Sequence, residues 1–150
     1  MSKPKTRWIV IFVILVVLQL LALGYSNNPD ASSTEGLDKS DTAWLLVATA
    51  MVLFMTPGLS FFYGGMVSVK NVISTMLQSF IALGVISLLW YLVGFSLAFG
   101  DSIGGIIGNP ATFFAFNGVG LGVHPALSPT VPLMLFAFFQ LKFAIITPAL

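Results

Sequence analysis

The sequence predicts an all-α fold, a polytopic bundle of membrane-spanning helices, and three observations support this prediction. Of the 150 residues, 57% are hydrophobic and only 7% are charged, whereas a soluble domain carries about 25% charged residues. The mean hydropathy is +1.01. No charge lies within 8–29, 42–69, 71–100 or 102–141, and each window exceeds the roughly 20 apolar residues that cross a bilayer as a helix.

The same composition excludes several classes of protein. So few charges cannot coat the surface of a soluble enzyme, and the apolar content excludes a disordered tail. The net charge of +1 provides no basic field for nucleic acid. The chain has no cysteine, so it has no disulfide framework, no thiolate nucleophile and no Cys-based zinc site. We therefore expect no enzyme activity, no cofactor, no metal site and no nucleic-acid partner.

Residues 1–26 have the order of a signal peptide or a signal-anchor. Three cations in the first seven residues precede an apolar run over 8–23, and small residues follow it. The run is long for a cleaved signal and nearly long enough to span a bilayer, so both alternatives stay open. In both, the cations lie in the cytoplasm by the positive-inside rule, and residues 27–41 lie outside.

The segment 27–41 is predicted to be an external linker. It is rich in Asn, Ser, Asp and Thr and contains Pro29 and Gly36, a composition that cannot bury a core. Its four acidic residues favour a solvated spacer over a metal site.

The apolar block over 42–69 predicts the first helix of the bundle. Asp41 and Thr42 are candidates for its N-cap. A Pro-Gly pair at 57–58 breaks the pattern, which lipid tolerates only where neighbouring helices or water satisfy the freed carbonyl. A Gly-Gly pair at 64–65 allows another helix to approach closely. Together these pairs indicate a bundle of several helices and not a single anchor.

A second helix is predicted over 72–99, after a turn at Lys70 that we place in the cytoplasm. Its sparse serines and glycines are ordinary devices for packing membrane helices. Trp90 and Tyr91 lie inside the block instead of at its edge, so we interpret them as packing residues.

Residues 101–130 contain too many Gly, Pro and Asn residues for a membrane helix and predict a long external loop. Its apolar residues indicate that the loop packs against the bundle. His124 is the only histidine, and a structural or solvated role is favoured over a proton relay.

A third helix of the bundle is predicted from about residue 131. Phe136, Phe139, Gln140, Phe143 and Thr147 fall on one stripe of this helix. Such a stripe is more often bundle core than a binding surface, and both interpretations are retained. Residues 42–150 thus predict three transmembrane helices.

Lys142 is an exception to the apolar pattern. It lies about 11 residues, or roughly 17 Å, beyond residue 131. A charge at that depth usually faces a partner or the bundle interior, and no acidic residue within 102–150 can serve it. Structural pairing with an acid outside this chain is favoured over a transport role, which predicts that the chain is the front of a longer protein.

Four stretches, in order and at matching spacing, resemble the ammonium transporter family, the Amt/Mep/Rh group. They are DTAW at 41–44 leading into VLFMTPG at 52–58, FFYGGMV at 61–67 with KNV at 70–72, GFSLAFG at 94–100, and FQLKFAIITPAL at 139–150. The resemblance covers 41–150 and is weakest over 101–130. It identifies the chain with the N-terminal part of the family's fold.

This resemblance implies an eleven-helix fold of two inverted halves and a homotrimer with one pore per subunit, a plan suited to transport near the bilayer midplane. Phe139 then resembles an aromatic residue of the family's outer ammonium site, and Phe143 resembles the first gate phenylalanine. Gln140 lies in the same stretch of the substrate pathway. The second gate phenylalanine and the two pore histidines of the family belong to later helices that this chain does not contain.

The function implied is the transport of ammonium or ammonia, with methylammonium as an analogue, across the inner or plasma membrane as part of a full-length transporter. A cytoplasmic regulator is a further partner that the sequence leaves open. The alternative is a truncated membrane fragment, or an assembly subunit, that binds other helices and transports nothing. The two differ in whether further apolar blocks follow residue 150.

Overall fold

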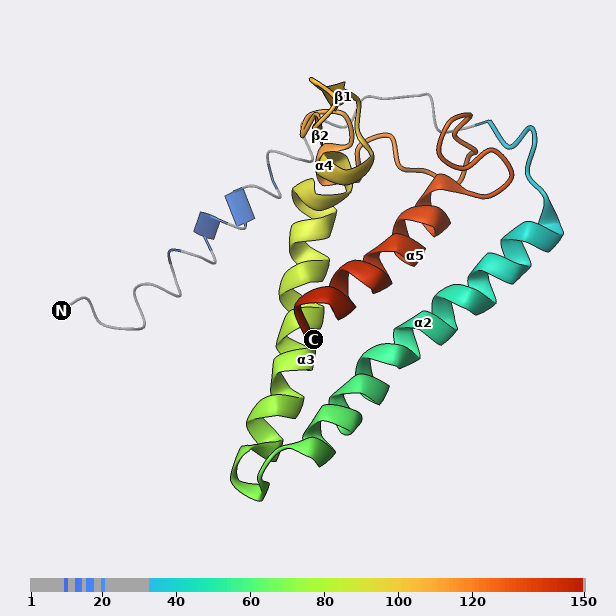
Figure 1. Cartoon of the computed structure of the whole chain (residues 1–150). Coiled ribbons are helices and arrows are strands. Elements are labelled where there is room, and N and C mark those ends of the chain that lie inside the picture. The colour runs from blue at the N-terminus through green and yellow to red at the C-terminus, as the bar shows by residue number, and fades with distance from the viewer. Residues whose placement is uncertain (1–9, 11–12, 15, 18–19, 21–32, 150) are drawn as a thin grey trace.

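The computed structural model describes residues 10, 13–14, 16–17, 20 and 33–149. Most of the predicted signal peptide or anchor over 1–26, and residues 27–32 of the predicted linker, fall outside the described residues. Within 33–149, two long antiparallel helices stand side by side and a shorter helix packs against both (Figure 1). The residues before the first long helix and the segment that leads from the second long helix to the shorter one gather at one end, which we call the loop end.

Helix α2 (Lys39–Met66) begins one turn earlier than the predicted block over 42–69. Its N-cap is Asp38, whose carboxylate accepts hydrogen bonds from the backbone N–H groups of Ser40 at 2.7 Å and Asp41 at 2.9 Å. The assignment of the cap to Asp41 and Thr42 is therefore wrong. Asp38 is extended, so its side chain can turn back onto the free N–H groups, whereas Asp41 already lies in the first helical turn.

The helix continues through Pro57 and buries a stripe of small residues, Thr56, Ser60 and Gly64, at intervals of four. This stripe faces the next helix, because the Ser60 hydroxyl donates to the carbonyl of Met76 at 3.2 Å. A Cβ added at Gly64 would lie 3.0 Å from Cγ of Met76, which confirms the predicted close approach. At Gly65 a Cβ would meet nothing within 4 Å, so no helix of the described chain approaches closely there.

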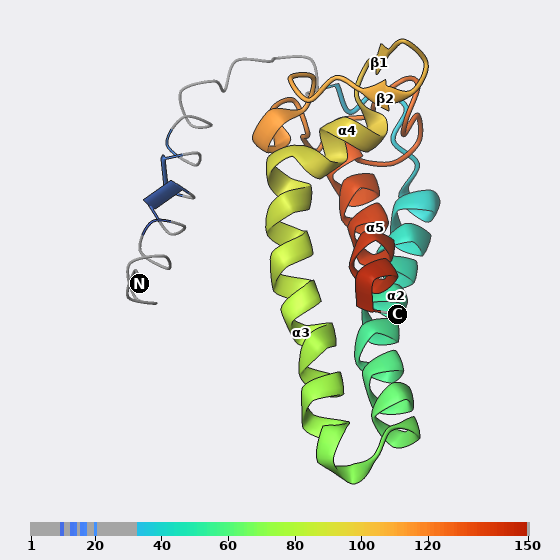
Figure 2. The same cartoon turned by 60° about the vertical axis from the view of Figure 1, so that its left-hand side comes forward.

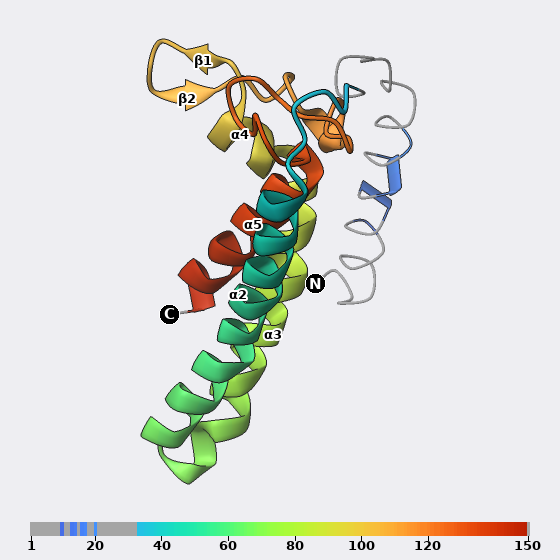
Figure 3. The same cartoon turned by 90° about the vertical axis from the view of Figure 1, so that its right-hand side faces the viewer.

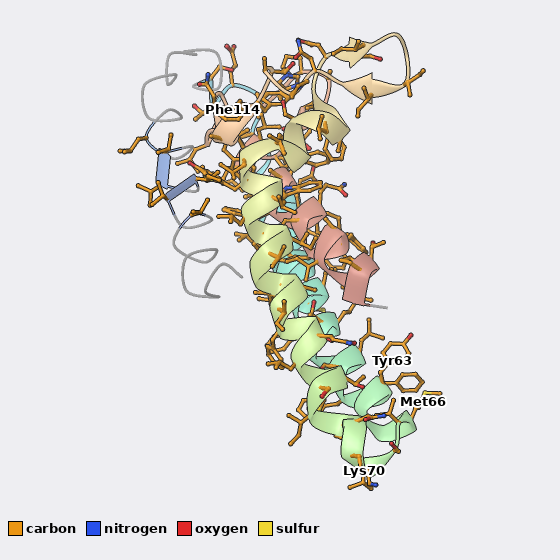
Figure 4. All side chains as sticks on the ribbon, turned by 90° about the vertical axis from the view of Figure 1, so that its left-hand side faces the viewer. Tyr63, Met66, Lys70 and Phe114 are labelled. Atoms are coloured by element: carbon orange, nitrogen blue, oxygen red, sulfur yellow. The ribbon has the colours of Figure 1, made fainter. Side chains whose placement is uncertain are left out.

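A short turn, η2 (Val69–Asn71), leads into α3 (Val72–Leu89), which continues through a π-helical turn, η3 (Trp90–Gly94), into α4 (Phe95–Phe99). Two spans, Lys39–Met66 and Val69–Phe99, are long and apolar enough to cross a membrane. Figure 4 shows Lys70 with Tyr63 and Met66 at one end of these helices and Phe114 at the other.

The predicted loop over 101–130 packs against the helices, as expected. It forms a hairpin of β1 (Ser102–Ile103) and β2 (Ile107–Gly108) and a turn, η4 (Phe114–Phe116). Phe113, Val119 and Val123 are buried within it. Figure 3 shows the hairpin extending beyond the helices at the loop end.

The residues just before α2 join the same end. The backbone N–H of Asp38 donates to the carbonyl of Thr130 at 2.9 Å, and that of Val123 donates to Ser33 at 3.0 Å. Residues 33–38 and 101–130 therefore share one end of the molecule, opposite Lys70, as the predicted alternation requires.

Helix α5 (Leu133–Ile146) starts at the loop end, lies against both α2 and α3, and leads into η5 (Thr147–Ala149) (Figure 2). Its 14 residues correspond to a length of about 21 Å, so it reaches only part of the way along the two longer helices. Leu133, Ala137, Leu141 and Ile145 form its buried face. Around its first turns Phe95, Phe113 and Val119 complete the core.

Candidate functional site on helix α5

Two phenylalanines one turn apart on α5 form the most distinctive side-chain arrangement on this helix. The rings of Phe139 and Phe143 lie 5.2 Å apart between centroids and meet edge to face at 72°. A separation of four residues places both side chains on one side of a helix. The edge-to-face arrangement is the one that aromatic quadrupoles favour. The two aromatic residues of the predicted pathway are thus brought together as a pair.

The aromatic pair lies off the buried face of its helix. The core of the described chain uses the stripe that begins at Leu133 and passes through Ala137, whereas Phe143 is 43% exposed and Phe139 is half-buried. Within the described residues this part of the stripe is not packed against the core, and whether it is core of a larger bundle stays a prediction. Only Phe136 packs there, with its ring 5.1 Å from that of Phe99.

Gln140 adds an amide beside the pair. It is half-buried, and its side chain makes no hydrogen bond to any residue of the described ranges. An amide offers an acceptor oxygen and two N–H donors, so it can bind a cation that carries N–H groups through its oxygen. The three predicted pathway residues therefore lie within two turns of α5 and combine aromatic surface with one polar acceptor.

Trp90 holds α5 in place through a contact that the sequence interpretation missed. Its indole N–H donates to the carbonyl of Ala137 at 3.2 Å, across 47 positions of sequence. The ring also packs against Phe95 and Phe99 at centroid distances of 6.0 and 6.3 Å. The packing role expected for Trp90 is confirmed, and a half-buried indole is itself a signal that a hydrogen-bond acceptor lies nearby.

Tyr91 also packs as expected, with its ring 5.4 Å from that of Phe116.

Ser96 joins the loop over 101–130 to α4. Its fully buried hydroxyl donates to the carbonyl of Asn109 at 2.8 Å and accepts from the backbone N–H of Phe113 at 2.8 Å. Gly108 lies so close that an added Cβ would collide with the Ser96 carbonyl oxygen. The sequence had indicated only ordinary helix packing for this serine, because its partners are 13 and 17 residues away.

His124 stabilises a turn. Its Nδ1 accepts from the backbone N–H of Leu127 at 3.2 Å, and its backbone exchanges hydrogen bonds with Ser128 at 3.1 and 2.9 Å. Its ring meets Phe113 edge to face at 6.0 Å. These contacts confirm the structural role expected for it.

Lys142 is half-buried on α5, one residue from Phe143, and has no ion pair within the described ranges. The acidic residues of these ranges are Glu35, Asp38, Asp41 and Asp101, all near the loop end of the molecule. Among described residues, no group of three His, Cys, Asp or Glu could hold a metal ion.

An open cleft of about 570 Å³ lies beside the first turns of α2. Leu37, Thr42 and Leu46 line it together with Pro132, which precedes α5. None of its lining residues belongs to α5 itself, so the cleft and the aromatic pair are separate features.

A sequence model described as Ammonium Transporter Family matches residues 43–150. An "Ammonium transporter" of Mycobacterium tuberculosis (strain ATCC 25618 / H37Rv) is 46% identical over 127 residues, covering 75% of this chain and 26% of that protein.

Two further relatives carry the same description. That of Aquifex aeolicus (strain VF5) is 46% identical over 121 residues, which cover 79% of this chain and 28% of the relative. That of Bacillus subtilis (strain 168) is 40% identical over 116 residues, which cover 76% and 28%. The chain thus spans about a quarter of the length of the curated relatives it matches.

Proposed function

The chain belongs to the ammonium transporter family, and from this premise we propose that it forms part of the pathway for ammonium and ammonia in a full-length transporter of the cell membrane. The observation that carries the proposal is the pair of Phe139 and Phe143, which is directed away from the core of its own three helices. A pathway wall must be exposed on one side and supported on the other, and α5 has both kinds of face.

An aromatic pair suits the capture of a small cation. A cation over an aromatic face gains about 0.5–2 kcal/mol, and more when water is excluded. Ammonium also carries N–H groups that can donate hydrogen bonds to the Gln140 oxygen, whereas a potassium ion of similar size has no such donors. We assign Phe139 and Gln140 to this capture step.

Passage beyond the aromatic pair requires that ammonium be converted to neutral ammonia. Moving a bare cation through an apolar channel costs many kcal/mol of lost hydration. Neutral ammonia avoids this cost if ammonium releases its proton near the gate, and a metal ion cannot follow because it has no proton to release. Phe139 lies about 9 Å and Phe143 about 15 Å along α5 from its first residue. We assign Phe143 to the gate because it is the deeper of the two.

The organisation of the segment follows from the same premise. We propose that residues 1–26 are a signal peptide or signal-anchor, 27–41 an external linker whose last three residues form the first turn of α2, and 42–150 the first three transmembrane helices of the transporter domain. The hydrogen bonds that join residues 33–38 to the loop over 101–130 support a shared external side. Lys70, at the opposite end, is then cytoplasmic.

On the family resemblance we further propose that the full-length protein forms a homotrimer and that a cytoplasmic regulator binds it.

The 150-residue chain alone is expected to behave differently from the full-length protein. Within residues 33–149 the aromatic pair has no second wall opposite it, since Phe143 is 43% exposed. We therefore expect the isolated segment to insert as a membrane fragment that does not transport.

The test is the uptake of radiolabelled methylammonium by proteoliposomes that contain the full-length protein. We expect uptake above that of empty liposomes, inhibition by added ammonium, and no inhibition by an equal concentration of potassium. The isolated 1–150 segment, reconstituted at the same protein-to-lipid ratio, is the matched control. Uptake by the full-length protein no greater than that of empty liposomes would contradict the proposal.

A further inference from the structure

The connection between Trp90 and α5 has the geometry of a positioning device. Trp90 is the first residue of η3, the π-helical turn within the long span from Val69 to Phe99. A π-helical turn inside an α-helix widens the coil and is frequent at functional sites. Here the wider turn lies where the span carries its one side-chain hydrogen bond to α5 among the described residues.

Gly94 makes room for the indole. A Cβ added at Gly94 would lie 3.2 Å from Cε3 of Trp90 and 3.3 Å from the carbonyl oxygen of Leu89. Both contacts are tighter than ordinary van der Waals contact, so a side chain at position 94 would press on the indole and on the helix backbone. The glycine at this position therefore leaves space for the ring that bonds to α5.

The indole is attached at a chemically defined point. Its N–H donates to the carbonyl of Ala137, a residue that is 0% exposed and belongs to the buried face of α5. A carbonyl oxygen has two lone pairs, so this acceptor can also keep its helical bond to the N–H of Leu141. The methyl side chain of Ala137 allows the two helices to approach closely.

A second contact fixes the rotation of α5 about its axis. The indole packs on Phe99 at 6.3 Å, and Phe99 packs edge to face on Phe136 at 5.1 Å. Phe136 and Ala137 are consecutive, so α5 is held at two adjacent positions that point in different directions around the helix. Phe139 follows Ala137 by only two residues, so the same attachment fixes its direction.

Directional attachment matters because the rest of α5 offers little resistance to rotation. Of its 14 residues, only Gln140 and Lys142 are polar, so apolar contacts alone specify its orientation weakly. We propose that Trp90 is a positioning residue of the pathway: its N–H bond to Ala137 sets the rotation of α5 and thereby aims Phe139 and Phe143. This inference rests on the proposed function of the aromatic pair.

The experiment removes the N–H donor and keeps the bicyclic ring. In the full-length transporter, Trp90 is replaced by benzothienylalanine, in which sulfur takes the place of the indole N–H and the ring shape is kept. The matched control places the same residue at Trp44, which is 78% exposed and makes none of these contacts. Trp90→Phe, which also shortens the ring, serves as the conventional variant.

We expect the Trp90 isostere to raise the KM for methylammonium by about fivefold, the equivalent of one typical hydrogen bond. Maximal uptake per assembled transporter and the amount of assembled protein should stay unchanged, because ring packing is retained. A variant that was merely less stable would lower the amount of assembled protein and leave KM alone. The Trp44 isostere should behave as wild type.

A second readout is independent of transport. para-Fluorophenylalanine at position 143 reports the surroundings of that ring by fluorine NMR, and its resonance should shift in the Trp90 isostere and not in the Trp44 isostere. An unchanged KM together with an unchanged resonance would overturn the positioning role, and so would loss of assembly in the isostere. A wild-type protein that transports nothing would instead overturn the proposed function, and the resonance would still decide whether Trp90 aims α5.

Discussion

Replacing Phe143 by alanine separates a gate from an ordinary packing residue. A fully buried phenylalanine costs about 3–5 kcal/mol to truncate. Phe143 is 43% exposed in the described chain, which leaves 57% of its surface buried. Scaling by that buried share gives a loss of stability of about 2–3 kcal/mol, of which the edge-to-face contact with Phe139 accounts for about 0.5–1.5 kcal/mol.

Phe138 provides a matched control on the same helix. It is 41% exposed, so Phe138→Ala should cost a similar free energy of unfolding. It lies five residues before Phe143 and therefore points about 140° away around the helix. Its ring lies 6.1 Å from that of Phe116, and among the described residues it makes no ring–ring contact with Phe139 or Phe143.

The assay is methylammonium uptake by full-length variants in proteoliposomes, divided by the amount of assembled transporter. We expect Phe143→Ala to lower this specific uptake by about 2- to 13-fold, because Phe139 loses the edge-to-face contact of about 0.5–1.5 kcal/mol that orients it for cation capture. Phe138→Ala should leave it unchanged while reducing the yield to a similar extent. Unaltered specific uptake in Phe143→Ala, with a lower yield, would return Phe143 to a packing role and refute the reasoning.

Two further predictions concern the architecture. Reporter fusions of the full-length protein at residues 35, 70 and 115 should be read as outside, inside and outside; an external signal at 70 would overturn the assignment of the two long spans. Gly64→Leu should destabilise the protein by about 1–3 kcal/mol because Met76 occupies the space. Gly65→Leu should stay within about 0.5 kcal/mol of wild type. Thermal unfolding in detergent measures both, and equal effects would contradict the packing described for α2.

The positions of the two long helices could be predicted from the distribution of charged and apolar residues along the sequence. Stretches without charge mark the membrane spans, and the predicted block over 72–99 coincides with the combined bounds of α3, η3 and α4. The start of α2 was placed three residues late because Asp38 and Asp41 are equally capable caps in sequence. Only the backbone conformation of Asp38 decides between them.

The facing of α5 could not be predicted in the same way. Periodicity shows that Phe139 and Phe143 share one side of the helix, and the structure agrees. Periodicity does not show which side meets α2 and α3, because nearly every side of this helix carries apolar residues. The same limit applies to Trp90 and Ser96, whose hydrogen-bond partners are distant in sequence and are set by the tertiary fold.

The most direct test of the central claim, that the aromatic pair lines an ammonium pathway, uses a cysteine as a probe. Residues 1–150 contain no cysteine, so in an otherwise cysteine-free transporter Phe139→Cys introduces a single thiol. The account predicts that an ammonium-bearing methanethiosulfonate, added from outside, modifies this thiol faster than the thiol of Phe138→Cys. It also predicts that added ammonium slows the reaction at residue 139 alone. Equal rates at the two positions, or no protection by ammonium, would contradict the account.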